Sequence, residues 1–387
     1  MKILGYNSSH ETSLAQVDYE TGTLDFCYEE SRFRRNKNYT PQEGDICLAG
    51  FHRQVETPEH LICASYDRRV FKMEWNTDLG LQDGLKSREI LEALGSKQST
   101  LEHLTDIRKK YPKYWTNFEY AFEDHDDILH ERIADQFGLD NYNFEYEHHL
   151  YHAWCGYHFF KKHFGDQPVI CITWDGGGAK PYHHDNLPNY QEVETIYRIE
   201  PDVEHPLKQY QRLCNLREAM HNVHTPQTYE DIHLCYTPEF RTDGDAEIEY
   251  TSLPSAGQNF SNASAGFGFD KLGRSAGKVM GAASYAPYHH NTGVMPRFSS
   301  YAICNLLEEQ SLEFSCNIIQ KAIDLNPDIE HIVLSGGYSL NCTNNYKYTQ
   351  RFPKHKFFVD PIPHDGGTAV GAALRLRKCL QEGKDGV

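Results

Sequence analysis

The sequence predicts an α/β fold made of two related lobes with a cleft between them. The chain has 387 residues, enough for one large two-lobed domain with a sizeable core. Each half contains strand-like segments, then a helical segment, then strand-like segments that end in glycine turns. No solenoid-type repeat or low-complexity linker interrupts this order. We therefore treat residues 1–387 as one module, with a first lobe of about residues 1–165 and a second of about 166–387.

The first half opens with strands. MKILGYN and SLAQVDYETGTLDFCYEE alternate with period two, and the turn residues ETG predict a β-meander. Residues from 37 to about 140 are less regular and contain helical patterns. A helix is predicted from His148 to about Phe164, and PVICITWDGGG follows as a buried strand ended by a glycine turn.

The second half repeats this order. Residues 180–270 are polar and turn-rich, with a second meander expected in their early part. Residues 296–325 predict a long amphipathic helix. IEHIVLSGGYSL then predicts strand, glycine turn and helix, KFFVDPIPHDGG predicts strand and turn, and TAVGAALRLRKCL predicts a closing helix.

Composition excludes several classes of protein. Hydrophobic residues at 39% and charged residues at 24% are typical of a globular chain, and no apolar run reaches the ~20 residues that span a bilayer. The N-terminus is too soon polar for a signal peptide, so we expect a cytoplasmic protein. The net charge of −17 argues against a broad nucleic-acid surface. Cysteines without CxxC pairs indicate reduced thiols.

Two histidines suggest a metal site. His148 and His152 are four residues apart, so they share one helical face. With 22 His in the chain, about one such pair is expected by chance. Asp175 and Asp365 each end a strand-like run, and the four together would suit Fe(II), Zn or Mn. Spacing alone does not bring them together, and an Asp at such a place often caps a turn or a helix.

Glycine-bearing segments suggest a nucleotide cleft. Three of the four follow strand-like runs, where backbone N–H groups can approach a phosphate, although ordinary turns also use glycine. The segments are 175–178, 277–281, 335–337 and 365–368. Neither GxxxxGK[ST] nor GxGxxG is present, which leaves an actin-like or sugar-kinase-like fold as the nucleotide-binding interpretation.

The N-terminal region offers candidate catalytic groups. His10 follows the first strand and could act as a general acid or base, or be an ordinary turn residue. The charge run from Glu29 to Lys37 is most simply a solvated loop. Its alternative role is an anion-binding arm in which Lys37 or Arg32 meets a phosphate or a carbonyl oxygen.

Seven motifs in order carry a family resemblance. They are N-x-SH-E-x-S at 7–13, E-x-RF-x-R-x-K at 30–37, HH-x-x-HA at 148–153, DG-x-G at 175–178, GKVMG-x-A-x-Y at 277–285, SGG-x-x-x-N at 335–341 and P-x-x-x-D-x-GTA-x-GAA at 361–373. Together they resemble the O-carbamoyltransferase family of nodulation and antibiotic-tailoring enzymes. The chain departs from that pattern at Ser31, Ser284 and Ala286, and residues 40–140 and 180–270 match loosely.

The resemblance implies an actin-like (ASKHA) two-lobed fold of duplicated RNase H-like subdomains. It implies that His148, His152, Asp175 and Asp365 hold Fe(II) or another divalent metal, which contacts the phosphate of carbamoyl-adenylate. The family's catalytic histidine and lysine correspond to His10 and Lys37. Arg32 is expected to assist Lys37 in stabilising the oxyanion. The residues expected to bind the nucleotide, as carbamoyl-adenylate or ATP, are Gly176, Gly177, Lys278, Ser335, Gly336, Gly337, Asn341 and Gly366.

Family members usually continue into a second module that resembles the YrdC carbamoyl-adenylate synthases. This chain ends at Val387, so we expect a separate YrdC-like protein to supply the adenylate. The expected acceptor is a hydroxyl of a sugar, another small molecule or a modified nucleotide. Two alternatives stay open. One is a threonylcarbamoyl-type transferase acting on tRNA, and the other is a catalytically idle subunit that binds metal and nucleotide.

Overall fold

The fold was analysed in a computed structural model of the chain. The structure describes residues 1–9, 11–35, 58–64, 133–140, 142–145, 147–179, 190–201, 205–215, 239–243, 245–251, 253–267, 269, 275–285 and 300–384. The predicted helical patterns between residues 65 and 132 lie outside these ranges, as do His10 and Lys37.

The first sheet has five strands in the order β3-β2-β1-β4-β5. Their bounds are β1 Lys2–Asn7, β2 Ser13–Asp18, β3 Leu24–Glu29, β4 His60–Ala64 and β5 Asn143–Glu145. The first three strands are antiparallel, as the alternating sequence predicted, and β4 and β5 run parallel to β1. Gly22 allows the tight turn between β2 and β3 because its φ is +69°, a value that side chains disfavour.

The second sheet has seven strands in the order β12-β11-β6-β7-β8-β10-β9. Their bounds are β6 Val169–Trp174, β7 Tyr190–Ile199, β8 Leu207–Asn215, β9 Glu239–Asp243, β10 Ala246–Thr251, β11 His331–Ser335 and β12 Lys356–Val359. Strands β6, β7 and β8 form an antiparallel meander, and β11 and β12 run parallel to β6. These five strands repeat the order and directions of the first sheet, and β10 and β9 extend it at one edge.

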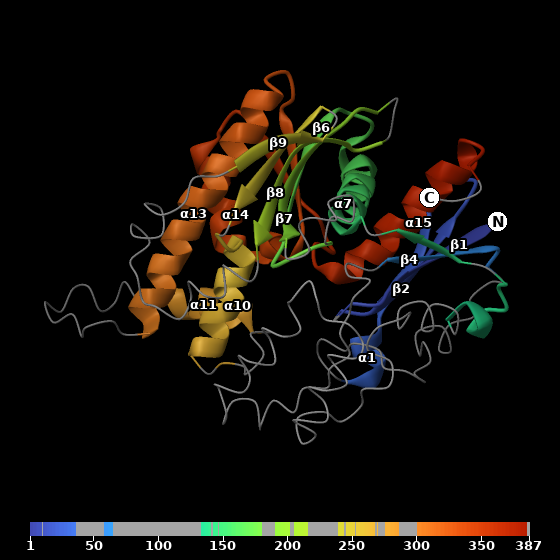
Figure 1. The fold of residues 1–387 in the computed structure, drawn as a ribbon, viewed down its shortest axis with the longest axis horizontal. Coiled ribbons are helices and arrows are strands. Elements are labelled where there is room, and N and C mark those ends of the chain that lie inside the picture. The colour runs from blue at the N-terminus through green and yellow to red at the C-terminus, as the bar shows by residue number, and fades with distance from the viewer. Residues whose placement is uncertain are drawn as a thin grey trace, which may run out of the picture.

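Among the helices that the structure describes, some lie between the two sheets and others cover the opposite face of the second sheet (Figure 1). The helical segments are α1 Glu30–Arg34, α7 His148–Phe164, α10 Ala256–Gly266, α11 Ala276–Ala283, α13 Ser300–Leu325, η2 Gly337–Leu340, α14 Cys342–Arg351, η3 Asp365–Gly367 and α15 Thr368–Gln381. Helices α7 and α15 pack against each other between the sheets, whereas α10, α11, α13 and α14 cover the far face.

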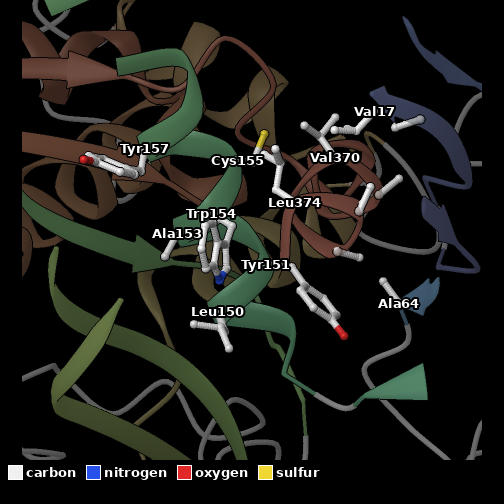
Figure 2. Packing of buried hydrophobic residues seen from close by; sticks show 14 of the residues in the cluster. Val17, Ala64, Leu150, Tyr151, Ala153, Trp154, Cys155, Tyr157, Val370 and Leu374 are labelled. Carbon is white, nitrogen blue, oxygen red and sulfur yellow. The ribbon is translucent and has the colours of Figure 1, made fainter. Parts of the chain in front are cut away.

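Alternate side chains of β6 face two different hydrophobic cores. Val169 and Cys171 face the core that contains α7 and α15, while Ile170, Ile172 and Trp174 face the core with α10, α11, α13 and α14. In the first of these cores, Figure 2 shows Cys155 of α7 near Val370 and Leu374 of α15, with Val17 of β2 beyond them. A strand buried on both faces explains the continuous apolar run VICITW.

Small residues let α15 approach its neighbours closely. A Cβ on Gly371 would lie 1.8 Å from the Tyr151 carbonyl oxygen of α7, and a Cβ on Gly5 would lie 1.9 Å from the Ala369 carbonyl oxygen. Helix α15 follows the second sheet in sequence but packs on β1, β2 and β4 of the first. Residues 166–387, expected to form the second lobe, therefore include one helix that belongs to the packing of the first sheet.

The repeated five-stranded topology is that of duplicated RNase H-like subdomains, so the fold is the predicted actin-like α/β fold. One of the four glycine-bearing segments is helical, because residues 277–281 lie within helix α11. Among the cysteines that the structure describes, all are free thiols, as predicted. In the described part of the chain, no helix has both the length and the apolar character needed to cross a membrane.

Candidate metal centre

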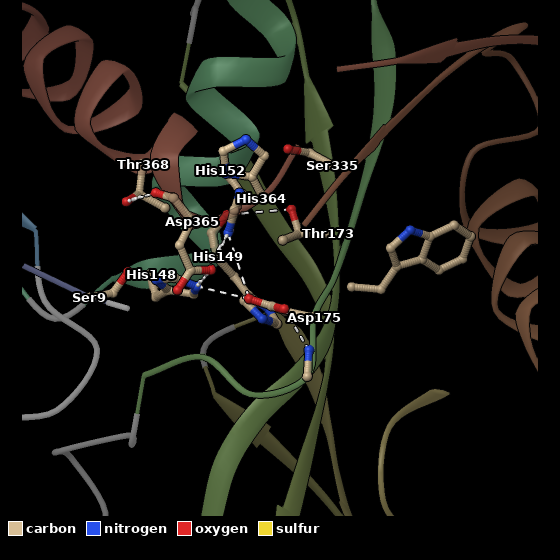
Figure 3. A network of polar contacts seen from close by, with 12 residues as sticks. Ser9, His148, His149, His152, Thr173, Asp175, Ser335, His364, Asp365 and Thr368 are labelled. Carbon is tan, nitrogen blue, oxygen red and sulfur yellow. Dashed lines mark hydrogen bonds and ion pairs between the residues drawn. The ribbon is translucent and has the colours of Figure 1, made fainter. Parts of the chain in front are cut away.

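Four side chains from three segments meet where the two sheets approach each other. His148 and His152 lie on the first turns of α7, Asp175 follows β6, and Asp365 begins the turn before α15. One potential ligand atom from each of the four lies within 4.8 Å of all the others. Figure 3 shows these side chains converging from their separate elements. The structure thus brings together the four residues that the sequence proposed as metal ligands.

The distances between ligand atoms suit one shared cation. His148 Nε2 lies 3.1 Å from Asp175 Oδ2, 3.5 Å from Asp365 Oδ1 and 3.2 Å from His152 Nε2. His152 Nε2 lies 3.8 Å from both Asp175 Oδ2 and Asp365 Oδ1. Four ligands at ~2.1 Å from a tetrahedral metal would be about 3.4 Å apart. The observed separations lie around that value.

The charges of the four side chains also favour a bound cation. Burial lowers the pKa of His148, but the carboxylates of Asp365 and Asp175 outweigh it and raise that pKa to about 10. Burial lowers the pKa of His152, but the hydrogen bonds that its ring donates to Asp175 and Asp365 outweigh burial, so that pKa is also raised. Burial and Asp365 raise the pKa of Asp175, but hydrogen bonds that it accepts from the two histidines lower it to about 2. Two carboxylates here need positive charge, which a divalent cation would supply while leaving both imidazoles neutral.

Local structure aims the ligands at one point. The N-terminus of α7, where partial positive charge gathers, points its first turn at the two carboxylates. The Asp175 backbone N–H donates to the Val193 carbonyl oxygen at 3.1 Å, which ties the end of β6 to β7. The Asp365 carbonyl oxygen accepts from Asn7 Nδ2 at 2.9 Å and from Thr368 Oγ1 at 2.6 Å. The first residue of the N-terminal motif therefore holds the last ligand.

The middle histidine of HHLYH lies outside the cluster. The Nδ1 atom of His149 is 2.8 Å from Thr195 Oγ1, and burial lowers the pKa of His149 well below its ordinary value. Gly178 must be small beside it, because a Cβ there would come within 2.8 Å of the His149 ring. His149 is therefore a core residue.

Several predicted nucleotide-binding glycines adjoin the cluster. A Cβ on Gly337 would lie 2.9 Å from Asp175 Oδ1, and a Cβ on Gly336, where φ is +88°, would lie 2.2 Å from the Trp174 carbonyl oxygen. Gly176 and Gly177 continue directly from Asp175, and a Cβ on Gly177 would overlap the Gln191 side chain. Two glycine segments from different strands therefore lie against each other beside Asp175.

The other predicted nucleotide-binding side chains have partners within the protein. Ser335 Oγ donates to Asp360 Oδ2 at 2.7 Å, and Asn341 Oδ1 accepts from the Asn344 N–H at the start of α14. Lys278 lies on the exposed face of α11 and donates to the Phe269 carbonyl oxygen at 3.2 Å. Gly366 packs against the His364 ring. The roles of these residues toward a nucleotide remain predictions.

Of the predicted catalytic residues, Arg32 lies in the described part of the chain. Its side chain is 78% exposed, and its Nε lies 3.5 Å from Glu29 Oε2. His10 and Lys37 lie outside the described residues. Among the described residues on either side of His10, Asn7 Nδ2 donates to Ser9 Oγ at 2.9 Å and Thr12 Oγ1 donates to the Ser9 carbonyl oxygen at 2.8 Å.

Sequence reasoning missed the buried carboxyl of Glu192. Its Oε2 accepts from the Ala179 N–H at 3.2 Å and its Oε1 from Gln211 Nε2 at 2.5 Å, so it shapes the loop after Asp175. Burial raises the pKa of Glu192 to about 7. Its position within a β-strand gave no signal, because single acidic residues in strands are common on solvent faces.

Comparison with known proteins relates one segment of this chain to a protein family. Residues 300–374 match the family model of the carbamoyltransferase N-terminus. This segment runs from α13 into α15 and contains the Ser335–Gly337 turn and Asp365. Within this fold, the matched segment is therefore similar to part of the carbamoyltransferases, a class of enzymes. No curated protein matches the sequence.

Three solved structures match nearly the whole length of this chain at low sequence identity. Full-length HypF in its phosphate- and nucleotide-bound form is 13% identical, with 98% of this chain and 56% of that chain covered and a TM-score of 0.47. A ROK family protein from Streptococcus pneumoniae TIGR4 in complex with sucrose is 10% identical, with 99% of each chain covered and a TM-score of 0.42. Component A of (R)-2-hydroxyglutaryl-CoA dehydratase from Acidaminococcus fermentans is 9% identical, with 98% and 99% covered and a TM-score of 0.42.

This chain spans just over half the length of the HypF chain. None of the three likenesses reaches a TM-score of 0.5, and the fold is defined by the two sheet orders described above.

Proposed function

We propose that this protein transfers a carbamoyl group from carbamoyl-adenylate to a hydroxyl of a sugar, another small molecule or a modified nucleotide, with release of AMP. One observation carries the proposal. Asp365 lies within the segment that matches the carbamoyltransferases, and it meets three further potential ligands from outside that segment. The family match and the metal geometry therefore meet at one residue.

The ligand set would be His148, His152, Asp175 and Asp365. Two imidazole nitrogens and two carboxylates suit Fe(II), Zn or Mn rather than a metal that prefers thiolates. A divalent cation held there would neutralise negative charge on the donor's phosphate and so make AMP a better leaving group.

The glycine segments beside Asp175 would receive the nucleotide part of the donor. Gly176, Gly177, Gly336 and Gly337 leave backbone open where side chains would block it. Residues 335–341 would lie along the adenosine. Asn341 would act there through its place at the start of α14, since its side chain caps that helix.

The chemistry of transfer would fall to N-terminal residues. His10 would accept the proton of the acceptor hydroxyl as its oxygen attacks the carbamoyl carbon, a contribution of typically ~10²–10⁴-fold. The bond from that carbon to the phosphate oxygen then breaks, and AMP leaves. Lys37, with Arg32, would stabilise the negative charge that develops on the carbamoyl oxygen. Contacts of Asn7 and Glu11 with the Asp365 backbone support this arrangement, because both residues are close to His10 in sequence.

A donor-release assay tests the proposal. The purified chain would be incubated anaerobically with Fe(II) and with carbamoyl-adenylate, supplied either as the compound or by a separate carbamoyl-adenylate synthase. Hydroxyl compounds such as sugars, aminoglycosides and nucleosides would serve as acceptors. We expect AMP release that a chelator abolishes and that Asp365→Asn lacks.

Three results would contradict parts of this account. Failure to bind the adenylate in the presence of metal would overturn the proposed function. Binding of the adenylate without carbamoyl transfer to any of these acceptors would favour a catalytically idle subunit. Carbamate formation from carbamoyl phosphate and ATP by the chain alone would contradict the proposal that a separate protein makes the adenylate.

A further inference from the structure

A second cluster of ionisable side chains, His364, Glu11 and Glu29, lies next to Asp365. The His364 ring is placed between two carboxylates, with Nδ1 2.9 Å from Glu11 Oε2 and Nε2 3.3 Å from Glu29 Oε1. All three side chains are partly buried, with between 21% and 25% of each exposed. Opposite edges of one ring therefore engage two carboxylates from different segments.

This cluster joins three separate parts of the chain. Glu11 belongs to the N-terminal motif, Glu29 ends β3 immediately before α1, and His364 precedes Asp365 in the turn that leads to α15. Figure 3 labels His364 beside Asp365 and the two helix histidines. The His364 ring consequently connects the first sheet to the turn that bears a proposed ligand.

Glu11 makes the connection to Asp365 direct. Its Oε2 atom accepts a hydrogen bond from the Asp365 backbone N–H at 3.1 Å and also contacts His364 Nδ1. One carboxylate oxygen therefore fixes both the backbone of the ligand residue and the ring next to it. Because the Asp365 side chain leaves that backbone, its aim at the cation depends on this contact.

The shape of the turn also depends on the His364 ring. A Cβ on Gly366 would lie 2.7 Å from His364 Cε1 and 3.0 Å from His364 Nδ1. Glycine at this position is therefore required by the ring itself. Ser13 Oγ holds the next carbonyl by donating to the Gly366 oxygen at 2.8 Å, so the turn is bonded to the first sheet on both sides of the ring.

We propose that His364, held between Glu11 and Glu29, is a positioning residue that keeps the Asp365 carboxylate aimed at the cation. The proposal deepens the proposed function, because it rests on the cation site of His148, His152, Asp175 and Asp365. His364 does not touch the cation in this arrangement. It holds the ligand residue Asp365 in place without contacting the metal. Loss of such a partner typically costs ~10–100-fold in metal affinity.

Cobalt(II) binding to the purified full chain tests the proposal. Affinity would be measured by titration calorimetry, and the visible absorption of bound Co(II) would report its ligand set. We expect His364→Ala to weaken binding ~10–100-fold and to alter the spectrum at saturation. Gly366→Ala should do the same by displacing the ring. Glu29→Gln should have a smaller effect than Glu11→Gln, because Glu11 also holds the Asp365 backbone.

Matched variants separate positioning from general damage. His163→Ala removes an exposed histidine from the far end of α7 and should bind Co(II) as the wild type does. Combining Glu11→Gln with His364→Ala should cost less than the sum of the single effects, since both act on one contact. Circular dichroism would check that each variant is folded, and Glu29→Gln gives a milder change if His364→Ala does not fold.

The outcomes distinguish failure of the positioning role of His364 from failure of the proposed cation site. If the wild type bound no Co(II), the proposed cation site would be overturned. If the wild type bound Co(II), and folded His364→Ala and Glu29→Gln bound it within twofold of the wild type with the same spectrum, the positioning role of His364 would be overturned.

Discussion

At the scale of single residues, the helix histidines gain their meaning from the carboxylates that they meet. His148 and His152 share a helical face by their spacing alone, and the sequence could therefore select them. Their meeting with Asp175 and Asp365 depends on two sheets and a turn, which spacing does not encode. Residue chemistry suggested that the four could form one ligand set, and the family resemblance implied a metal there, before the fold was known.

His364 marks the limit of sequence reasoning at this scale. Its partners Glu11 and Glu29 lie hundreds of positions away, and the hydrogen bond between Asp365 and Glu11 spans 354 residues. One histidine among 22 carries no signal of its own. Such long-range pairs are visible only in the folded chain.

His10→Ala and His148→Ala should fail in different ways. Loss of the proposed general base should reduce carbamoyl transfer by at least ~10²-fold while adenylate and metal still bind. Loss of a ligand should instead remove metal and adenylate binding together. Equilibrium dialysis of both ligands, alongside AMP release, checks this. Equal loss of adenylate binding in both variants would contradict the separate roles.

His158 should make stability depend on pH. Burial, with Lys162 and Lys161 nearby, lowers the pKa of His158 from 6.5 to about 4. Between these values the unfolded chain binds a proton that the folded chain does not, so stability falls as pH decreases through that window. From pH 7 to pH 5 the wild type should lose about 1–2 kcal/mol more than His158→Leu, because one pKa unit corresponds to ~1.4 kcal/mol. Urea unfolding at both pH values measures this, and equal losses would contradict it.

At the scale of elements, strongly patterned segments followed their predictions. Helix α7 has the predicted bounds, and β6, β11 and α15 formed where apolar runs and glycine turns indicated. The segment 277–281 became helix because Val279 and its neighbours bury one face against α13, which outweighs the helix-breaking tendency of its glycines. Strands β9 and β10 were not predicted, because their residues are polar and gain their pairing only at the edge of the second sheet.

Gly371→Ala should strongly destabilise the protein. Its Cβ would meet the backbone oxygen of Tyr151 at 1.8 Å, so α7 and α15 would have to separate. We expect the free energy of unfolding to decrease by ~1–3 kcal/mol or more.

Gly281→Ala is the matched control. It also lies in a helix, but no atom lies within 4 Å of the added Cβ. This variant should be stabilised by about 0.5–1 kcal/mol. Chemical denaturation measures both variants, and equal effects would contradict the close packing of α15 on α7.

At the scale of the whole molecule, the duplicated topology explains why the site lies where it does. The five strands of the first sheet and five of the seven in the second have the same order, and α7 lies between the two sheets. The coarse recurrence of strands, helix and glycine turns was enough to predict two related lobes. It did not show that the last helix returns to the first sheet, because helical periodicity does not say which sheet a helix covers.

The net charge of −17 bears on the choice of acceptor. A strongly acidic molecule should bind RNA weakly at physiological salt, because phosphates would face like charge. We therefore expect no saturable binding of bulk tRNA below about 1 µM in a filter-binding assay, because the dissociation constants of nonspecific binding are ~10⁻⁴–10⁻⁶ M. Tight, salt-resistant binding would favour the threonylcarbamoyl-type alternative.

The central claim is that four side chains from three segments hold one divalent cation. Metal analysis of the anaerobically purified chain after loading with Fe(II), Mn(II) or Zn(II) tests it most directly. The account predicts one bound ion per chain in the wild type and none in a variant with His148→Ala, His152→Ala, Asp175→Asn and Asp365→Asn, with the fold retained. A folded wild type without bound metal, or a folded quadruple variant with the same stoichiometry, would contradict it.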